Sequence, residues 1–301
     1  MKILLLGKNG QVGWELQRSL EPLGQVIALG RAGADGLVGD LRDLDGIRQT
    51  LRLIRPDVVV NAAAYTAVDK AESDPEEARR INTLAPECIA AVVAEQGSWM
   101  VHYSTDYVFD GGGAKPWQES AVAAPLNVYG HTKLEGEKTI ERSGCKHLIF
   151  RTSWVYSSRG NNFAKTMIRL AAERELLKVI DDQVGSPTSA ALIADVTAHA
   201  LRSAISGAGI SGLYHLTAAG RVSWYGYAEF VFNMLRSYGV ELKVKELEAI
   251  SSSNYVAPAK RPLNSLLDCS KLRDTFGVHL PTWQSGLSRM MMEAQGLSNE
   301  S

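Results

Sequence analysis

Residues 2–13 read KILLLGKNGQVG, and this stretch decides the fold class. A short apolar run ends in a turn with three evenly spaced glycines, Gly7, Gly10 and Gly13, and the amphipathic segment VGWELQRSL follows. A buried strand, a glycine turn and a helix in this order are typical of a dinucleotide-binding unit, where a pyrophosphate lies on the helix N-terminus. A turn that only packs the helix on the strand gives the same pattern, so the neighbouring segments must decide.

Apolar runs alternate with amphipathic segments through the first half of the chain. The runs are VIALG, DVVVNAAA, WMVHYST and HLIFRTSWVY, and the segments between them include 44–54 and 75–96. Asp74 as N-cap and Pro75 in the first turn would start the second of these helices. Strands that are apolar throughout and alternate with helices indicate a parallel sheet covered on both faces. The sequence therefore predicts an α/β fold with a Rossmann-type doubly wound parallel sheet.

The regular alternation loosens near residue 155, which suggests a second, smaller lobe. We predict an NAD(P)-binding domain over residues 1–155, completed by part of 178–205, and a C-terminal substrate-binding lobe over 156–301. Within that lobe we expect a helix in NNFAKTMIRLAAERE, a helix from about residue 191 and a strand at GLYHL. The segment 251–262, rich in serine and proline, reads as an extended loop.

The composition of the chain limits the classes of partner that it can be expected to bind. The 301 residues carry a formal net charge of -1, which argues against nucleic acid and favours a small-molecule partner. No apolar run is long enough for a membrane span, and the N-terminal run is too short for a signal peptide. The three cysteines form no CxxC pair, so neither a disulfide framework nor a zinc site is indicated. A reducing compartment, the cytoplasm, is expected.

The residues after the second apolar run bear on cofactor choice. VIALG ends at Gly30-Arg31, where an acidic residue would normally accept the ribose hydroxyls of NADH. The guanidinium of Arg31 suits a 2′-phosphate, so NADPH is the first choice and NADH remains possible; an exposed arginine without a partner is the alternative. Asp40 and Leu41 would lie near the adenine, unless Asp40 is a solvated loop acid. Ala62, Ala63 and Ala64 allow close backbone approach to the cofactor, although helix packing also explains alanines.

Tyr129 and Lys133 are four residues apart in NVYGHTKLEGEK, so a helix places both on one face. An ordinary tyrosine titrates near about 10, and a nearby ammonium group lowers that pKa. WMVHYST delivers Thr105 and Asp106 to the carboxyl edge of the sheet, where Thr105 can share a substrate oxygen with Tyr129. These side chains together predict that Tyr129 donates a proton to a substrate carbonyl as a hydride is delivered to it.

These motifs together resemble the extended short-chain dehydrogenase/reductase family. The glycine turn, NAAA at 61–64, YSTDYVFDG at 103–111 and YGHTK at 129–133 carry the resemblance. The further matches NAAAYTAVDKAE, PLNVYGHTKLEGE, FRTSWVY, GNNFAKTM and RPLNSLLD extend it beyond residue 268. They are similar to members that reduce the C4 ketone of dTDP-4-dehydro-6-deoxy-L-mannose to dTDP-L-rhamnose with NAD(P)H, a precursor of polymers such as lipopolysaccharide. The resemblance therefore implies a dTDP-sugar as substrate.

The resemblance also implies roles for single residues. Tyr129 would donate the proton, Lys133 would hold the nicotinamide ribose and lower the tyrosine pKa, and Thr105 and Asp106 would touch the sugar. Trp154 would pack beside the sugar, although a tryptophan in an apolar strand is more often core. The other residues that it implies for the cofactor are Gly7, Gly10, Gln11, Val12, Gly13, Ala62, Ala63, Ala64 and Tyr103. Asn162 and Arg261 would contact the nucleotide or diphosphate, unless Asn162 caps a helix and Arg261 serves packing.

Some relatives dimerise around magnesium through glutamates, and Glu15 and Glu293 are the matching candidates for such a homodimer. The helix near 190 reads SAALIAD and lacks a further glutamate where one is expected, so magnesium is only weakly indicated.

Two alternatives stay open. A nucleotide-sugar 4,6-dehydratase needs a further acid after Thr105-Asp106, and Tyr107 stands there instead, whereas a 4-epimerase is not excluded. A non-catalytic module like the regulatory subunit of methionine adenosyltransferase is the other alternative, and the presence of Thr105, Tyr129 and Lys133 argues against it.

Overall fold

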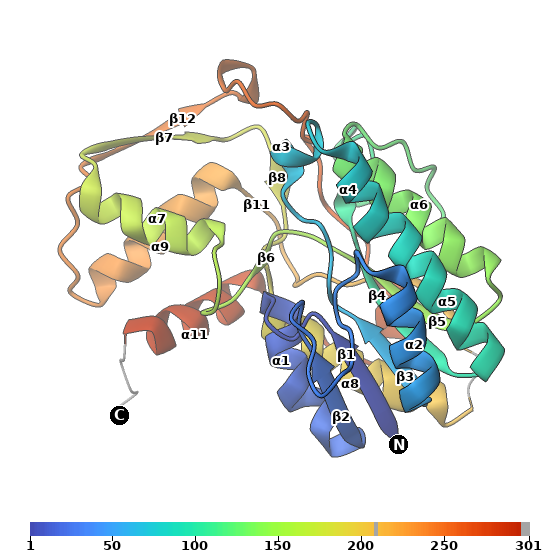
Figure 1. Ribbon diagram of the computed structural model, residues 1–301. Coiled ribbons are helices and arrows are strands. Elements are labelled where there is room, and N and C mark those ends of the chain that lie inside the picture. The colour runs from blue at the N-terminus through green and yellow to red at the C-terminus, as the bar shows by residue number, and fades with distance from the viewer. Residues whose placement is uncertain (208–209, 296–301) are drawn as a thin grey trace.

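A parallel sheet forms the centre of the molecule in this computed structural model, which describes residues 1–207 and 210–295 (Figure 1). Its six strands lie in the order β10-β5-β4-β3-β1-β2. Their bounds are β1 (Lys2–Leu6), β2 (Gln25–Leu29), β3 (Val58–Asn61), β4 (Trp99–Thr105), β5 (Lys146–Thr152) and β10 (Gly212–His215). All five neighbouring pairs are parallel. The predicted α/β fold with a Rossmann-type parallel sheet is confirmed.

Helices cover both faces of this sheet, as the apolar strands require. One core cluster joins the sheet to α1 (Gln11–Leu20), α8 (Ala190–Ile205) and α10 (Ser270–Phe276). A second cluster on the other face joins it to α2 (Leu44–Ile54), α5 (Ala85–Gln96) and the neighbouring α6 (Val128–Arg142). β1 has β2 on one side and β3 on the other, so the strand order reverses there. Ligands of such sheets bind at the carboxyl ends of the strands beside that reversal.

The sheet takes in more of the C-terminal half than the sequence predicts. Part of 178–205 does complete the first unit, because α8 packs along α1. The strand at GLYHL, however, is β10 and pairs with β5 at the edge of the central sheet instead of lying in the second lobe. α10 also packs on this unit. A four-residue strand carries no pattern that says which sheet it joins, so only the tertiary structure assigns it.

The helix predicted over 75–96 is interrupted. It consists of α4 (Pro75–Arg79), a π-helical turn (Arg80–Leu84) and α5. Pro75 does lie in the first turn, but Asp74 makes no side-chain cap and instead accepts a hydrogen bond from the Tyr65 hydroxyl at 3.3 Å. The π-turn brings the buried Asn82 toward α6, where its amide donates to Thr132 Oγ1 at 3.2 Å.

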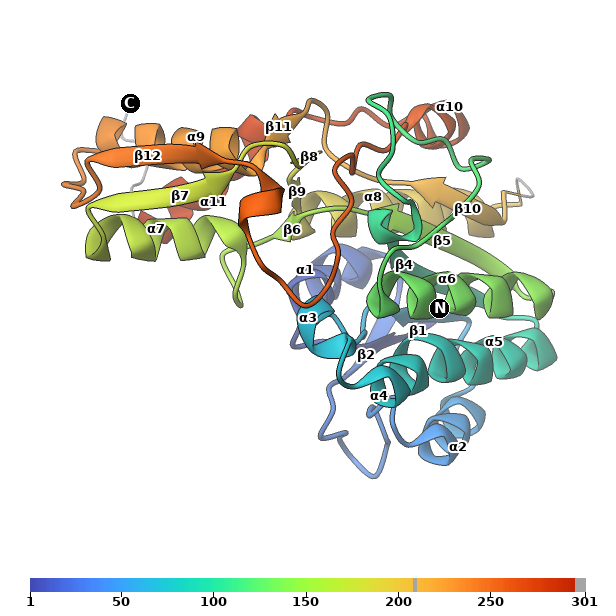
Figure 2. The same ribbon diagram turned by 90° about the horizontal axis from the view of Figure 1, so that it is seen from above.

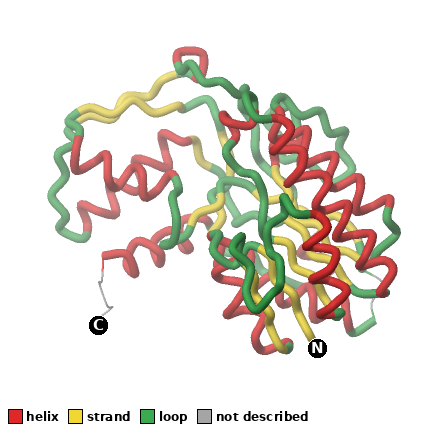
Figure 3. The backbone as a smooth tube through the Cα atoms, in the orientation of Figure 1, coloured by secondary structure: helices red, strands yellow, loops and turns green. Residues whose placement is uncertain are grey.

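The second lobe has a core of its own and projects to one side of the sheet (Figure 2). It contains α7 (Phe163–Glu173), β7 (Leu176–Ile180), α9 (Trp224–Ser237), β12 (Glu246–Ile250) and α11 (Trp283–Gln295). β7 and β12 pair in parallel. Long loop segments run between the lobe and the sheet, as Figure 3 shows in green.

Short elements complete the described chain. They are α3 (Val68–Ala71), β6 (Val155–Tyr156), β8 (Val184–Gly185), β9 (Thr188–Ser189), β11 (Val222–Ser223) and the 3-10 turns Glu21–Leu23, Asp106–Val108 and Ser252–Asn254. The predicted strand HLIFRTSWVY is therefore split into β5 and β6. Among the described residues, no helix has the length and apolarity needed to cross a membrane.

Candidate active site

The glycine turn packs directly against the end of β3. Gly7 has a φ of +89°, and a Cβ there would lie 2.7 Å from the backbone nitrogen of Ala63. A Cβ on Gly13 would lie 2.0 Å from the carbonyl oxygen of Gly7. At Gly10 the nearest atom, the carbonyl oxygen of Gly7, would be 3.4 Å away, which is an ordinary contact. Because Gly10 is the N-cap of α1 and offers no side-chain acceptor, the first N–H groups of α1 suit a pyrophosphate.

Tyr129 lies in the first turn of α6, and the turn is held from two sides. The Asn127 side chain caps the helix, because its Oδ1 accepts from the Gly130 N–H at 2.8 Å. The other end of the same amide donates to the carbonyl of Lys260 at 2.8 Å. One buried side chain thus ties the tyrosine turn to the loop 251–262, which explains why the tyrosine follows PLN in the sequence.

Thr105 and Asp106 lie at the carboxyl end of β4, beside Tyr129. They are 5% and 2% exposed. Burial raises the pKa of Tyr129 to about 12; the Thr105 hydroxyl acts in the opposite direction, and the Asp106 charge adds to the rise. The ring of Tyr107 stands edge-on to Tyr129 with the ring centres 5.8 Å apart. Tyr129 is therefore protonated at neutral pH, as a proton donor must be.

Asp106 is a buried carboxyl group with an incomplete set of partners. Its Oδ1 accepts from Thr105 Oγ1 at 3.1 Å, whereas its Oδ2 has no partner in the part of the chain that the structure describes. Burial raises its pKa to about 7, against the lowering effect of hydrogen bonds from Ser265 and Thr105. Both protonation states are accessible near neutral pH, so this carboxyl can donate or accept toward a sugar hydroxyl.

Lys133 is 2% exposed and lies one helical turn after Tyr129. Its Nζ donates to the carbonyl of Tyr103 at 2.5 Å and lies 3.1 Å from His102 Nε2. Burial lowers its pKa to about 8, although the Glu137 charge acts in the opposite direction. The expected lowering of the Tyr129 pKa by Lys133 is not found, because burial dominates and Lys133 is not among the causes of the shift.

The family model described as RmlD substrate binding domain matches residues 1–295 of this chain. The dTDP-4-dehydrorhamnose reductase of Escherichia coli (strain K12) is 55% identical over 293 residues, which cover 97% of this chain and 98% of the relative. This chain belongs to the dTDP-4-dehydrorhamnose reductase family.

Solved structures of the dTDP-4-dehydrorhamnose reductase family have the same fold. The reductase of Clostridium acetobutylicum ATCC 824 superposes with a TM-score of 0.89 at 36% identity, covering 98% of this chain and 100% of that one. The reductase of Bacillus anthracis str. Ames, in complex with NADP, has a TM-score of 0.86 at 34% identity, covering 97% of this chain and 99% of that one. Similarity therefore extends over both lobes.

Arg31, Asp40 and Leu41 were predicted to lie near the adenosine part of the cofactor, and their surroundings in the structure differ. Arg31 is exposed just after β2, and no ion pair is found for it within 1–207 and 210–295. Asp40 is bound to Arg42, which lowers the pKa of that carboxyl. Leu41 is 4% exposed and its side chain packs in the core against the sheet, so a cofactor contact at Leu41 remains a prediction. The arginine alone has its charged group free for a phosphate.

The remaining cofactor candidates gather at the ends of β3 and β4. Ala62 and Ala63 border the glycine turn, and Ala64 is exposed beyond them. The side chain of Tyr103 points instead to α8, where its hydroxyl lies 2.9 Å from Thr197 Oγ1, so only its backbone faces Lys133. The sequence pattern of β4 does not show which way the Tyr103 side chain points. Its assignment to the cofactor came from the resemblance alone.

Gln11 and Asn162, predicted for the cofactor and the nucleotide, contact each other across the two lobes. Asn162 Nδ2 donates to Gln11 Oε1 at 3.0 Å and to the carbonyl of Ser157 at 2.7 Å. Its Oδ1 caps α7 by accepting from the Lys165 N–H at 3.1 Å. Both amide hydrogens of Asn162 are used, so the helix cap is the reading that the structure favours. Val12 packs against the core.

Arg261 is paired inside the protein. Its guanidinium donates to Asp69 Oδ2 at 2.7 Å and to the carbonyl of Ala259 at 3.2 Å. The pair joins the loop 251–262 to α3, and Asp69 raises the pKa of the guanidinium while Arg261 lowers that of the carboxyl. A contact between Arg261 and the diphosphate remains a prediction. It requires the guanidinium either to bind Asp69 and the diphosphate together or to leave Asp69.

Trp154 sits at the entrance to the second lobe with a φ of +49°, which a bulky residue rarely adopts. Its indole stacks on Trp224 with ring centres 3.5 Å apart and planes 9° from parallel. On its other side lies Gly185, where a Cβ would meet the indole at 2.6 Å. The positive φ and the close contacts with Trp224 and Gly185 fix the orientation of this indole. Its role beside a sugar remains a prediction.

The two metal candidates lie far apart in the chain and each pairs with an arginine on its own helix. Glu15 lies 3.8 Å from Arg18, and Glu293 lies 3.1 Å from Arg289. Among the described residues, no cluster of three histidine, cysteine, aspartate or glutamate side chains could hold a metal. A magnesium ion shared by two copies of the chain remains a prediction.

Several residues around the site were not found from the sequence. His102 contacts Lys133 on one side and Asn61 on the other, and Glu137 accepts two hydrogen bonds of 2.9 and 2.6 Å from Arg151. Polar residues within the apolar runs VVVN, WMVHYST and HLIFRT were the available signal, because a polar group in a doubly covered sheet needs a partner.

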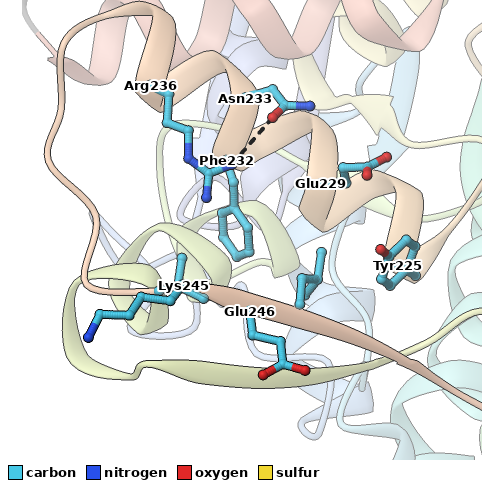
Figure 4. A pocket seen from close by; sticks show the side chains of 9 residues that line it. Tyr225, Glu229, Phe232, Asn233, Arg236, Lys245 and Glu246 are labelled. Atoms are coloured by element: carbon cyan, nitrogen blue, oxygen red, sulfur yellow. Dashed lines mark hydrogen bonds between the residues drawn. The ribbon is translucent and has the colours of Figure 1, made fainter.

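Two cavities lie away from this site. One of about 200 Å³ lies between α9 and β12 and is lined by residues such as Glu229, Arg236 and Lys245 (Figure 4). The other, of about 610 Å³, is formed by the loop 112–121. Neither is lined by a residue that the sequence analysis assigned to catalysis or binding.

Proposed function

We propose that this chain catalyses NADPH-dependent reduction of the C4 ketone of dTDP-4-dehydro-6-deoxy-L-mannose, giving dTDP-L-rhamnose. The observation that supports it most is the protonated Tyr129 beside Thr105 and Asp106 at the carboxyl edge of the sheet. This site lies next to a glycine turn that fits a dinucleotide, in a chain 55% identical to a reductase of that name.

A nicotinamide cofactor held at the glycine turn would supply the hydride that C4 of the sugar receives. Tyr129 donates its phenolic proton to the C4 oxygen as negative charge develops there. Thr105 lies beside the phenol and supplies a second hydrogen-bond donor to the same oxygen, which stabilises the developing alkoxide. In the structure without substrate, Thr105 Oγ1 donates its one hydrogen to Asp106 Oδ1 at 3.1 Å, so this hydroxyl must turn from Asp106 to the C4 oxygen when the sugar binds. Each step uses a side chain that is already positioned by β4 or α6.

NADPH is the preferred cofactor in this proposal. Arg31 is exposed at the end of β2, the place where a Rossmann fold meets the adenosine ribose. Arg31 therefore places a cation suited to a 2′-phosphate where an acidic side chain would otherwise bind the ribose hydroxyls.

The second lobe supplies the contacts to the dTDP-sugar in this proposal. Trp154 and the loop 251–262 both lie where the lobe meets the sheet, and Asn127 ties that loop to the tyrosine turn through Lys260. We place the reaction in the cytoplasm, where NADPH and nucleotide sugars are available and cysteines stay reduced.

The test is to follow NADPH consumption with verified dTDP-4-dehydro-6-deoxy-L-mannose and to compare the product with dTDP-L-rhamnose by chromatography. Equal amounts of NADPH consumed and dTDP-L-rhamnose formed are the expected result. A chain that binds NADPH but interconverts nucleotide sugars without net oxidation is an epimerase. A chain that binds NADPH and turns over neither substrate is a regulatory module, and both outcomes contradict the proposal.

A further inference from the structure

A chain of three buried polar side chains lies beneath the tyrosine turn. Asn61 on β3 and His102 on β4 are direct partners in the sheet register, and Lys133 reaches them from α6. The three side chains are 1%, 1% and 2% exposed. Asn61 Nδ2 lies 3.2 Å from His102 Nδ1, and His102 Nε2 lies 3.1 Å from Lys133 Nζ. Since water does not reach these groups, each hydrogen must be matched by an acceptor within the chain.

The orientation of Asn61 fixes the direction of the hydrogen bonds. Asn61 Oδ1 accepts from the Ala63 N–H at 3.2 Å, so its NH2 group faces His102 Nδ1. That ring nitrogen must therefore accept, and a neutral imidazole then carries its proton on Nε2. The Nε2–H points at Nζ of Lys133, and only a neutral amine has a lone pair to receive it. The amine still donates to the Tyr103 carbonyl.

The opposite direction leaves two donors facing each other. An ammonium group on Lys133 would donate to Nε2 and move the imidazole proton to Nδ1, where it would meet the NH2 of Asn61. Turning the Asn61 amide over would instead set that NH2 against the Ala63 N–H. An imidazolium is not an alternative, because burial lowers the pKa of His102 well below its ordinary value.

The charges around Lys133 compete with this effect. Glu137 lies one turn further along α6 and favours the ammonium form. Its carboxylate, however, is held by two hydrogen bonds from Arg151 on β5, so a cation already balances it. Tyr129, one turn earlier, is protonated and carries no charge at neutral pH. Asn61 and His102 are the groups that favour the neutral lysine.

We propose that Asn61 and His102 are positioning residues that stabilise Lys133 as a neutral amine and so make its ammonium form a ready proton donor. The consequence for turnover rests on the proposed reductase function. At neutral pH, solvent protonates Lys133, whose pKa is about 8, to its ammonium form. After Tyr129 has given its proton to the substrate, an N–H bond of this ammonium breaks and an O–H bond forms on the phenolate. The amine left behind is the form that the His102 Nε2–H stabilises.

The tautomer of His102 tests the proposal without any turnover. The protein labelled with 15N in its 6 histidines reports by NMR which ring nitrogen carries the proton. At about pH 9.5, where Lys133 with its pKa of about 8 is mostly the neutral amine, we expect His102 as the Nε2–H tautomer, assigned by the signals lost in His102→Gln or moved in Asn61→Asp. His215 is an internal control, because its Nδ1 donates to the Trp117 carbonyl at 3.0 Å and it must show the other tautomer. A proton on Nδ1 of His102 would overturn the proposal.

A pH profile gives the second test. In His102→Gln an amide oxygen can accept from an ammonium, and in Asn61→Asp a carboxylate draws the imidazole proton to Nδ1 and frees Nε2 to accept. Both changes favour the charged lysine, so the alkaline limb of kcat/KM should move upward by about one pH unit. His215→Gln, a buried histidine outside the chain of three, should leave the limb in place. A limb that stays fixed in both test variants contradicts the proposal, whereas absence of reductase activity in the wild type contradicts only the proposed function.

Discussion

The two ends of the candidate cofactor site are built differently. At the catalytic end, Thr105, Asp106 and Lys133 are at most 5% exposed, and the pKa values of Tyr129 and Lys133 are shifted by burial. At the adenosine end, Arg31 is exposed beside loops. Burial in a packed sheet keeps Tyr129 protonated and lowers the pKa of Lys133 toward neutral pH. Recognition of a phosphate needs only a free cation, which an exposed loop can supply at little cost to folding.

The largest effect is expected at the catalytic end. Tyr129→Phe should lower kcat by roughly a hundredfold to ten-thousandfold, because the proton donor is lost while the ring still packs. Steady-state kinetics and an NADPH binding titration measure this, and cofactor affinity should change little. Tyr107→Phe is the matched control, since its ring stacks edge-on to Tyr129 at 5.8 Å and has no assigned proton. Unchanged kcat in Tyr129→Phe would remove this residue from the mechanism.

A buried ion pair supports the same end. Glu137→Gln leaves the guanidinium of Arg151 buried without its carboxylate, at side-chain exposures of 5% and 3%. The free energy of unfolding should fall by about 3 kcal/mol in urea titration, the typical cost of an uncompensated buried charge. Glu173→Gln breaks the exposed pair with Arg169 and should cost about 0.5 kcal/mol or less. Equal losses in the two variants would show that burial does not distinguish them.

Asp106 should make stability depend on pH. Its pKa is raised from 3.8 to about 7 in the folded protein, so its stabilising effect is present below about pH 4 and is lost as pH rises through about 7. Asp106→Asn removes this loss. Relative to wild type, the variant should gain up to about 4 kcal/mol in unfolding free energy between acidic and mildly alkaline pH, because each unit of the pKa difference corresponds to about 1.4 kcal/mol. A difference that stays constant with pH would mean that folding does not raise the pKa of Asp106.

The smallest effect is expected at the adenosine end. Arg31→Ala should weaken NADPH binding by about tenfold and NADH binding much less, because one exposed charge-assisted contact to a phosphate is lost. Fluorescence titration with both cofactors measures the difference, and Arg52→Ala, an exposed arginine on α2, is the control. Equal losses for the two cofactors would separate Arg31 from cofactor choice.

The residues that sequence analysis recovered well are those whose chemistry is tied to local spacing. The glycine turn, the Tyr129-Lys133 pair and the strand-end Thr105-Asp106 all depend on a strand or helix that the apolar pattern already predicts. Residues placed in loops or by resemblance have partners that the sequence does not predict. Leu41 packs in the core, Asn162 caps a helix and Arg261 pairs with Asp69, and their ligand contacts remain predictions.

The sequence by itself determined the parallel sheet, the glycine turn at its edge and the helix face shared by Tyr129 and Lys133, because these follow from periods of two to four residues. Only the tertiary structure decided that β10 joins the central sheet and that His102 and Asn61 meet Lys133. It also decided the protonation of the site, since a pKa depends on burial and on partners distant in sequence. The order of residues along the chain indicates local periodic structure. It does not show which distant residues come into contact, nor the pKa values that depend on those contacts.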